Sequence, residues 1–177
     1  VMGGVSSSGF NVDSANSVGV WTGECKVVPS LKAPGFCNLE TKLLQGFHRA
    51  HFNDASDSTS LVLVVRSTTP DYLGFKVSFA ADTINPQFKS FKANFKVPPG
   101  SDWQTVMVPW TDFSNDWSPY TGDCNTTDPT GRTHKCCKDD PSVCPVKKNL
   151  KDIEQIGLWA EGHAGKFNLQ VLRVGAI

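Results

Sequence analysis

The residues in this sequence most suited to covalent chemistry are its cysteines, which number 6 in a chain of 177 residues. They are Cys25, Cys37, Cys124, Cys136, Cys137 and Cys144. An even number of cysteines in a chain of this size predicts disulfide bonds, which persist in oxidising compartments. Six reduced thiols are the alternative. The most plausible single pair is Cys25 with Cys37, because both flank a short loop that contains Pro and Gly.

The C-terminal cysteines, with His134 among them, also raise the question of a zinc site. Structural zinc sites are typically built from spaced pairs such as Cys-x-x-Cys. The sequence has no such pair, and Cys136 is adjacent to Cys137, an awkward arrangement for one tetrahedral ion. His48 and His51 are three residues apart, but their surroundings predict strand and turn, where they point to opposite faces. We therefore expect no metal ion.

Residues that could perform catalysis or hold a cofactor are not grouped in any recognisable pattern. The sequence contains no Gly-x-Ser-x-Gly motif and no phosphate-binding loop. Glu161 and His163 lie close together on a predicted loop, an arrangement that is common by chance. We expect no catalytic residue and no cofactor, and hence not an enzyme.

Three polar or aromatic residues are the candidates for contact with a partner protein or a glycan: Trp117, Tyr120 and His134. Aromatic faces beside Asp and Asn groups can form a platform for sugars. The favoured interpretation is different: Trp110 belongs to the core or a sheet edge, and Trp117 fixes the following polar segment to the domain.

The charge balance argues against nucleic acid as a partner. Lys and Arg together number 17, as do Asp and Glu, so the formal net charge is zero, whereas nucleic-acid-binding domains are usually basic. Residues 88–96 (FKSFKANFK) alternate aromatics with lysines as single-strand platforms do, but three lysines predict only a solvated strand face. The longest apolar run, residues 61–65, is too short to span a membrane.

The elements that must position these residues are mainly β-strands. Short apolar or alternating runs, punctuated by Pro and Gly turns, predict strands at residues 60–66, 72–79, 104–109 and 167–171. A helical turn is predicted at 149–154. Trp159 and Phe167 lie on patterned strands and are expected in the core. Strands of this length and spacing favour a β-sandwich or barrel, and the chain length favours one domain over residues 1–177.

Residues 114–148, called the insert below, differ from the rest of the chain. They are rich in Asp, Thr, Pro, Gly and Cys and lie between two predicted strands. A segment this long without strands is usually functional or disordered. Because it has four cysteines and few apolar residues, we expect disulfide bonds to order it as a stapled appendage.

Three blocks of sequence together resemble the complex I intermediate-associated protein 30 family. They are VMGGVS (residues 1–6), WQTVMVPWTDF (103–113), and IGLW (156–159) followed by GKFNLQV (165–171). The resemblance runs along the whole chain, with the Gly-Phe pair at residues 35–36 near a family position. The cysteine-rich insert departs from the pattern.

This resemblance implies an antiparallel, galactose-binding-like β-sandwich (a jelly roll) that carries out no reaction. It implies a role as an assembly factor or as an extrinsic (peripheral) subunit of a large membrane electron-transfer complex, with that complex's protein subunits as partners. The alternative is a secreted carbohydrate-binding module. A chain that begins at Val1, with these cysteines, indicates a cleaved leader and an oxidising compartment; the thylakoid lumen or the secretory route is favoured over the mitochondrial matrix.

Overall fold

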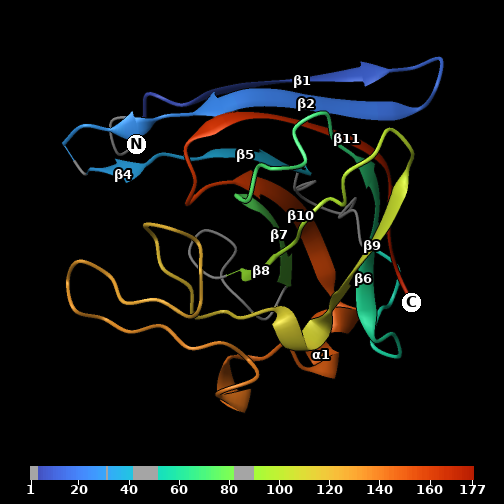
Figure 1. The fold of residues 1–177 in the computed structure, drawn as a ribbon. Helices are drawn as coiled ribbons and strands as arrows, with labels where there is room; N and C mark the ends of the chain where they lie inside the picture. Colours follow the sequence, from blue (N-terminus) through green and yellow to red (C-terminus); the bar gives the residue numbers. More distant parts are fainter. Residues whose placement is uncertain (1–3, 31, 42–51, 82–89) are drawn as a thin grey trace, which may run out of the picture.

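The computed structural model describes residues 4–30, 32–41, 52–81 and 90–177 (Figure 1). The histidines at positions 48 and 51 lie outside these residues. The strands are β1 (Ser7–Asp13), β2 (Val18–Cys25), β3 (Val27–Val28), β4 (Ala33–Pro34), β5 (Cys37–Glu40), β6 (Ser60–Arg66), β7 (Phe75–Ala81), β8 (Phe91–Asn94), β9 (Gln104–Pro109), β10 (Ile153–Ala160) and β11 (Gly165–Ala176). The helical segments are the 3-10 turns η1 (Trp110–Asp112) and η2 (Pro141–Val143) and the short helix α1 (Lys147–Lys151).

The strands form two main antiparallel sheets that pack face to face. One sheet has five strands in the order β1-β2-β11-β6-β9, and the other has four in the order β5-β10-β7-β8. A small β3-β4 pair completes the arrangement. In Figure 1, β1 and β2 form a long hairpin along the top of the molecule. The predicted antiparallel β-sandwich is therefore confirmed.

The alternation of side chains between the two faces of a strand decides which of them the sandwich buries. In β6, Leu61, Leu63 and Val65 are almost completely buried, and the residues between them are less so. The strands predicted at 60–66 and 104–109 have these same bounds in β6 and β9. The prediction at 167–171 is the middle of a longer strand, β11, and the prediction at 72–79 is shifted, since β7 begins at Phe75.

Aromatic side chains fill much of the space between the sheets. Phe79 has its ring centroid 5.0 Å from that of Phe91 and 5.5 Å from that of Trp110, and Phe113 packs 5.3 Å from both Phe79 and Trp110. Such edge and offset contacts add to the gain from burial. The predicted core position of Trp110 is confirmed.

The insert departs from the two-sheet plan as predicted, because its described residues include no strand beyond isolated bridges. Figure 1 shows it in yellow and orange as a group of loops beside β7 and β8. Every residue of β7 is buried. A strand buried on both faces needs a layer on each side; β7 has the sandwich core on one side and the insert on the other.

Within the described part of the chain, none of the helices has the length and apolar character needed to cross a membrane.

Candidate functional site

The candidate site is the outward face of the four-stranded sheet, which the insert covers. In β7, Val77 and Phe79 point into the core, so Lys76 and Ser78 point outward. The register of the sheet places Trp159 and Asn94 on either side of Lys76. The next row consists of residues 157, 78 and 92. The strands thus present two lysines and an indole on a face that is not the core.

Lys92 is the central residue of this face, and its side chain is fully buried. Its Nζ lies 2.6 Å from Oε1 of Glu161 and 3.8 Å from the ring centroids of both Trp117 and Trp159. Burial lowers the pKa of Lys92, and the nearby carboxylate of Glu161 opposes that effect. The ammonium is held between two indole faces with one carboxylate as its counter-ion, an arrangement that stabilises a desolvated cation.

Lys76 makes an ionic contact between the sheet and the insert. Its Nζ lies 2.7 Å from Oδ1 of Asp123, which belongs to the insert, and 2.6 Å from Oδ1 of Asn94. The Asn94 amide also donates to Asp123, at 2.9 Å. Desolvation acts to raise the pKa of Asp123, but the hydrogen bond and charge of Lys76 outweigh it, so this pKa lies below the ordinary value.

At Gly122 the insert lies close against Lys76 of the sheet and against Glu161. Its φ of +74° is in the left-handed region, and a Cβ there would overlap Oε1 of Glu161 and lie 2.7 Å from Cε of Lys76. Both the backbone conformation and the available space therefore require glycine.

Trp117 fixes the insert to the sheet, as the favoured interpretation predicts. Its Nε1 donates to the carbonyl of Ser90 at 2.7 Å, and Lys92 lies over its ring. Nearby, the backbones of Ser114 and Lys92 exchange two hydrogen bonds of 2.9 and 3.0 Å. A sugar cannot stack on the indole face that Lys92 occupies, so the structure gives the predicted Trp117 platform no support. Tyr120 is partly exposed and accessible to a partner.

His134 is buried and lies between two carboxylates of the insert. Its Nδ1 is 2.8 Å from Oδ1 of Asp116, and its Nε2 is 2.8 Å from Oδ2 of Asp128. Each ring nitrogen of His134 therefore faces a carboxylate oxygen within hydrogen-bond distance. Burial acts to raise the pKa values of Asp116 and Asp128, yet their hydrogen bonds with His134 and other groups lower both. His134 is thus an internal support of the insert and is not exposed to a partner.

The same cluster contains a serine, but its geometry does not fit a Ser-His-Asp triad. Ser118 is buried and donates its hydroxyl proton to Asp128, not to His134. In such a triad the serine gives its proton to the imidazole. Among the described residues, no group of His, Cys, Asp and Glu side chains could hold a metal ion.

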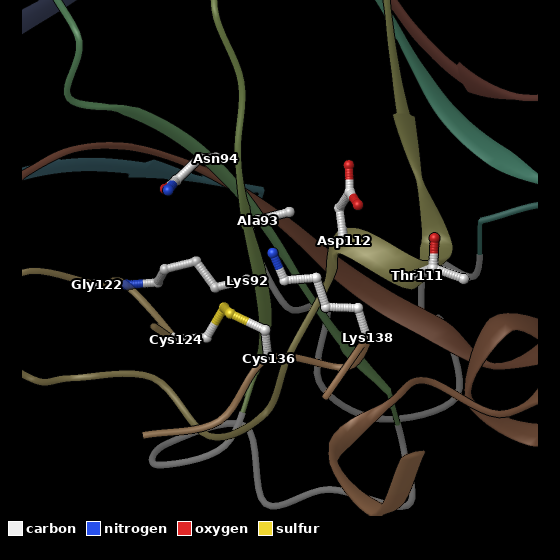
Figure 2. Close-up of a pocket in the computed structure, with 9 residues that line it drawn as sticks. All are labelled: Lys92, Ala93, Asn94, Thr111, Asp112, Gly122, Cys124, Cys136 and Lys138. Carbon is white, nitrogen blue, oxygen red and sulfur yellow. A yellow bond between two sulfur atoms is a disulfide. The ribbon is translucent and has the colours of Figure 1, made fainter. Parts of the chain in front are cut away.

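A small pocket opens where the insert meets β8 and η1. It has a volume of about 190 Å³, below the range of about 300–1,000 Å³ for drug-sized ligands. Figure 2 shows the Cys124–Cys136 disulfide on one wall and the Lys138 side chain extending toward Ala93. The full lining is Lys92, Ala93, Asn94, Thr111, Asp112, Gly122, Cys124, Cys136 and Lys138.

The cysteines confirm part of the disulfide prediction and correct the rest. Cys124 is bonded to Cys136, and Cys137 to Cys144, so two disulfides staple the insert and indicate an oxidising compartment. The predicted bond between Cys25 and Cys37 is wrong for this structure, because both are buried free thiols.

The two thiols belong to strands of different sheets, but they are neighbours in the core, and Cys37 is among the groups that act on the pKa of Cys25. Cys25 ends β2 in the five-stranded sheet, whereas Cys37 begins β5 in the other. The Cys25 thiol donates to the carbonyl of Ala160, 3.0 Å away. Burial raises the pKa of Cys25 to about 11, so this thiol is little ionised and poorly reactive near pH 7.

Sequence reasoning missed the residues that hold the insert down. Residues 88–96 were expected to form a solvated strand face, but Lys92 is fully buried. Trp159 was expected in the core, but its side chain is on the outward face of the sheet, where it contacts Lys92 and Ser78. A signal was present: residues 75–79 (FKVSF) and 91–95 (FKANF) both set a lysine and a small polar residue between two phenylalanines.

The fold and the site together define an antiparallel β-sandwich with a stapled polar insert that covers one sheet. The model of one family, complex I intermediate-associated protein 30 (CIA30), matches residues 1–126. The chain belongs to this family of complex I assembly factors, which are generally non-catalytic. The match ends near the start of the disulfide-bonded segment.

Several solved structures have a similar arrangement of strands. One is the family 11 carbohydrate-binding module of a cellulosomal cellulase of Clostridium thermocellum, with a TM-score of 0.48 and 14% identity over 96% of this chain and 82% of that one. Another is an exo-beta-agarase, with a TM-score of 0.49 and 10% identity over 97% of this chain and 22% of that one. Identities this low concern the fold alone. A search of curated proteins gave no match.

Proposed function

We propose that this chain is a non-catalytic protein-binding domain that acts as an assembly factor or an extrinsic subunit of a membrane electron-transfer complex. Membership of the CIA30 family is the observation that carries the proposal. The two disulfides support a location in an oxidising compartment. The proposed candidates are the thylakoid lumen and the secretory route.

We further propose that the exposed side of the insert is the docking surface. Recognition commonly uses loops that a rigid scaffold holds in place, and the insert is held by two disulfides and by the contacts of Lys76 and Lys92. Of the three predicted contact residues, His134 is buried, and Trp117 and Tyr120 are both partly exposed. Trp117 is already engaged by Lys92 and Ser90, so Tyr120 is the residue proposed to contact the partner. The carbohydrate-binding alternative gains no support from Trp117, so no second function is proposed.

The test is to replace the insert while keeping the sandwich. The backbone N–H of Asn115 donates to the carbonyl of Val143 at 3.0 Å, so the two ends of the insert already lie side by side. Residues 116–142 can therefore be replaced by two glycines, with Cys144→Ser to remove the cysteine left without its partner.

The shortened chain should keep its β-sheet circular dichroism but no longer co-migrate with its complex on native gels of solubilised membranes. Tyr120→Ala in the intact chain should weaken co-migration without changing the unfolding midpoint. A folded, shortened chain that still co-migrates would show that the insert is not the docking surface.

A further inference from the structure

A second surface with binding chemistry lies on the opposite side of the molecule, on the outward face of the five-stranded sheet. Val65 and Leu169 are completely buried in the core, so their neighbours Arg66 and Gln170 point outward. The register pairs Arg66 with Gln170, and Gln170 with Val20 on its other side. Three strands thus set these side chains in one row across the sheet.

Arg66 is held in place but retains most of its binding capacity. Its Nε donates to Oε1 of Gln170 at 2.8 Å, and its guanidinium carbon lies 4.5 Å from the ring centroid of Trp103. Within the described residues it forms no ion pair with a carboxylate. Four of the five N–H donors of an arginine are at its two terminal nitrogens, and these form the fork that matches a carboxylate.

Two hollows border this arginine, each with a volume of about 500 Å³. Both are lined by Arg66 and Gln170. One continues over Trp103 and Leu172 to Asp13, and the other continues along residues 67, 68, 70, 100 and 101. These volumes are within the range of pockets that bind ligands.

The charges and apolar groups around the hollows select the type of ligand. Asp13 is the carboxylate on the rim, and it accepts hydrogen bonds from the backbone of Ala15 and from the backbone and side chain of Asn16. The Asp13 carboxylate is therefore occupied by hydrogen bonds within its own turn, and the guanidinium of Arg66 is the charged group that is available to a ligand. Leu172 and Met107 are exposed on the same face, at 41% and 55%.

We propose that this face is a second protein-docking site, where Arg66 binds a glutamate or aspartate carboxylate of a partner and Trp103 and Leu172 receive a neighbouring apolar side chain. The bidentate fork suits a carboxylate, and exposed Leu and Met suit protein side chains better than hydroxyl-rich sugars. The inference rests on the proposed protein-binding function and adds a second contact on the side of the sandwich away from the insert.

The test is a titration of the full chain, labelled with ¹⁵N, with the peptide acetyl-Leu-Glu-Glu-Leu-amide. Its Glu→Gln counterpart is the uncharged control, and trigalacturonic acid is a carboxylate from a sugar. The signals to follow are the Nε–H of Arg66 and the indole N–H of Trp103. Arg66→Lys keeps the charge and removes the fork, and Arg173→Lys is the matched control, since Arg173 is exposed on the same strand as Gln170.

The glutamate peptide should shift both signals and the glutamine peptide should not. Arg66→Lys should weaken peptide binding about tenfold, and Arg173→Lys should leave it unchanged. Shifts with trigalacturonic acid alone, or no shift with any probe, would overturn the proposal. The titration uses no membrane complex, so its failure removes this site and leaves the insert to be judged separately by native gels.

Discussion

The buried ion pair between Lys92 and Glu161 gives a sharp test of how Lys92 is stabilised on the covered face, next to Trp117 of the insert. We consider Lys92→Met, Glu161→Gln and the double variant. The two side chains are 0% and 7% exposed, and their charged atoms are 2.6 Å apart. Each single change leaves one charge in a site from which water is excluded, whereas the double change leaves none.

The expected losses of unfolding free energy follow from this difference. Removing one partner of a buried pair typically destabilises a protein by about 3–5 kcal/mol. In Glu161→Gln the two indole faces still stabilise the ammonium, so about 3 kcal/mol is expected. Lys92→Met should lose a similar amount, because the carboxylate of Glu161 stays buried. The double variant should lose only about 1–2 kcal/mol, since a methionine packs well between aromatic rings.

The assay is urea unfolding followed by tryptophan fluorescence, with the disulfides intact. Lys147→Met is the matched control: Nζ of Lys147 lies 3.0 Å from Oδ1 of Asp57, but the two side chains are 79% and 92% exposed. That change should leave the unfolding free energy unaltered. If the losses of the two buried single variants simply add in the double variant, the pair is not coupled and the reasoning is refuted.

Three further predictions concern the insert, the thiols and pH. Gly122→Ala should destabilise the protein by more than about 2 kcal/mol in urea unfolding. The control is Gly131→Ala, which should lose about 1 kcal/mol, because Gly131 also has a positive φ but has open space where a Cβ would be added. Equal losses would contradict the close approach of Gly122 to the sheet. Titration with Ellman's reagent should detect no thiol in the native protein and two after unfolding, from Cys25 and Cys37; any other number after unfolding contradicts the pairing. The pKa of Asp123 is lower in the folded state than the ordinary carboxyl value of 3.8, so the stability that this residue contributes is complete above pH 3.8 and is lost as the pH falls through its folded-state pKa. The drop in unfolding free energy between neutral and acid pH should therefore be smaller in Asp123→Asn than in the unmodified protein.

Periodicity in the sequence was sufficient to predict the sandwich but not its covered face. In β11, Phe167 and Leu169 are buried, the residues between them are less so, and this alternation was readable in the sequence. β7 is buried on both sides, and Lys92 of the neighbouring β8 was predicted on a solvated strand face but is buried. Which lysines the insert covers depends on where Trp117 and Asp123 fold back onto the sheet, and local spacing carries no such information.

The same limit explains the outcome for the cysteines and the candidate contact residues. The two insert disulfides join residues 12 and 7 positions apart, close enough for a dense cluster to predict bonding within it. Cys25 and Cys37 are neighbours in the core but remain free thiols, an outcome that their spacing in the sequence did not predict. His134 was recognisable as unusual, but its two carboxylate partners come from positions 116 and 128, and only the folded loop shows that they enclose it.

The seam between the insert and the sheet has a consequence for how such a protein can change over evolutionary time. When a layer that packs through apolar surface is lost, it leaves an exposed hydrophobic patch, and such patches promote aggregation. Here the sheet beneath the insert presents Lys76, Ser78, Lys92 and Asn94, groups that water solvates readily. A sandwich of this kind can therefore gain, shorten or lose such a segment without exposing a large hydrophobic surface. The loops of the segment are then free to change in sequence as their binding partners change.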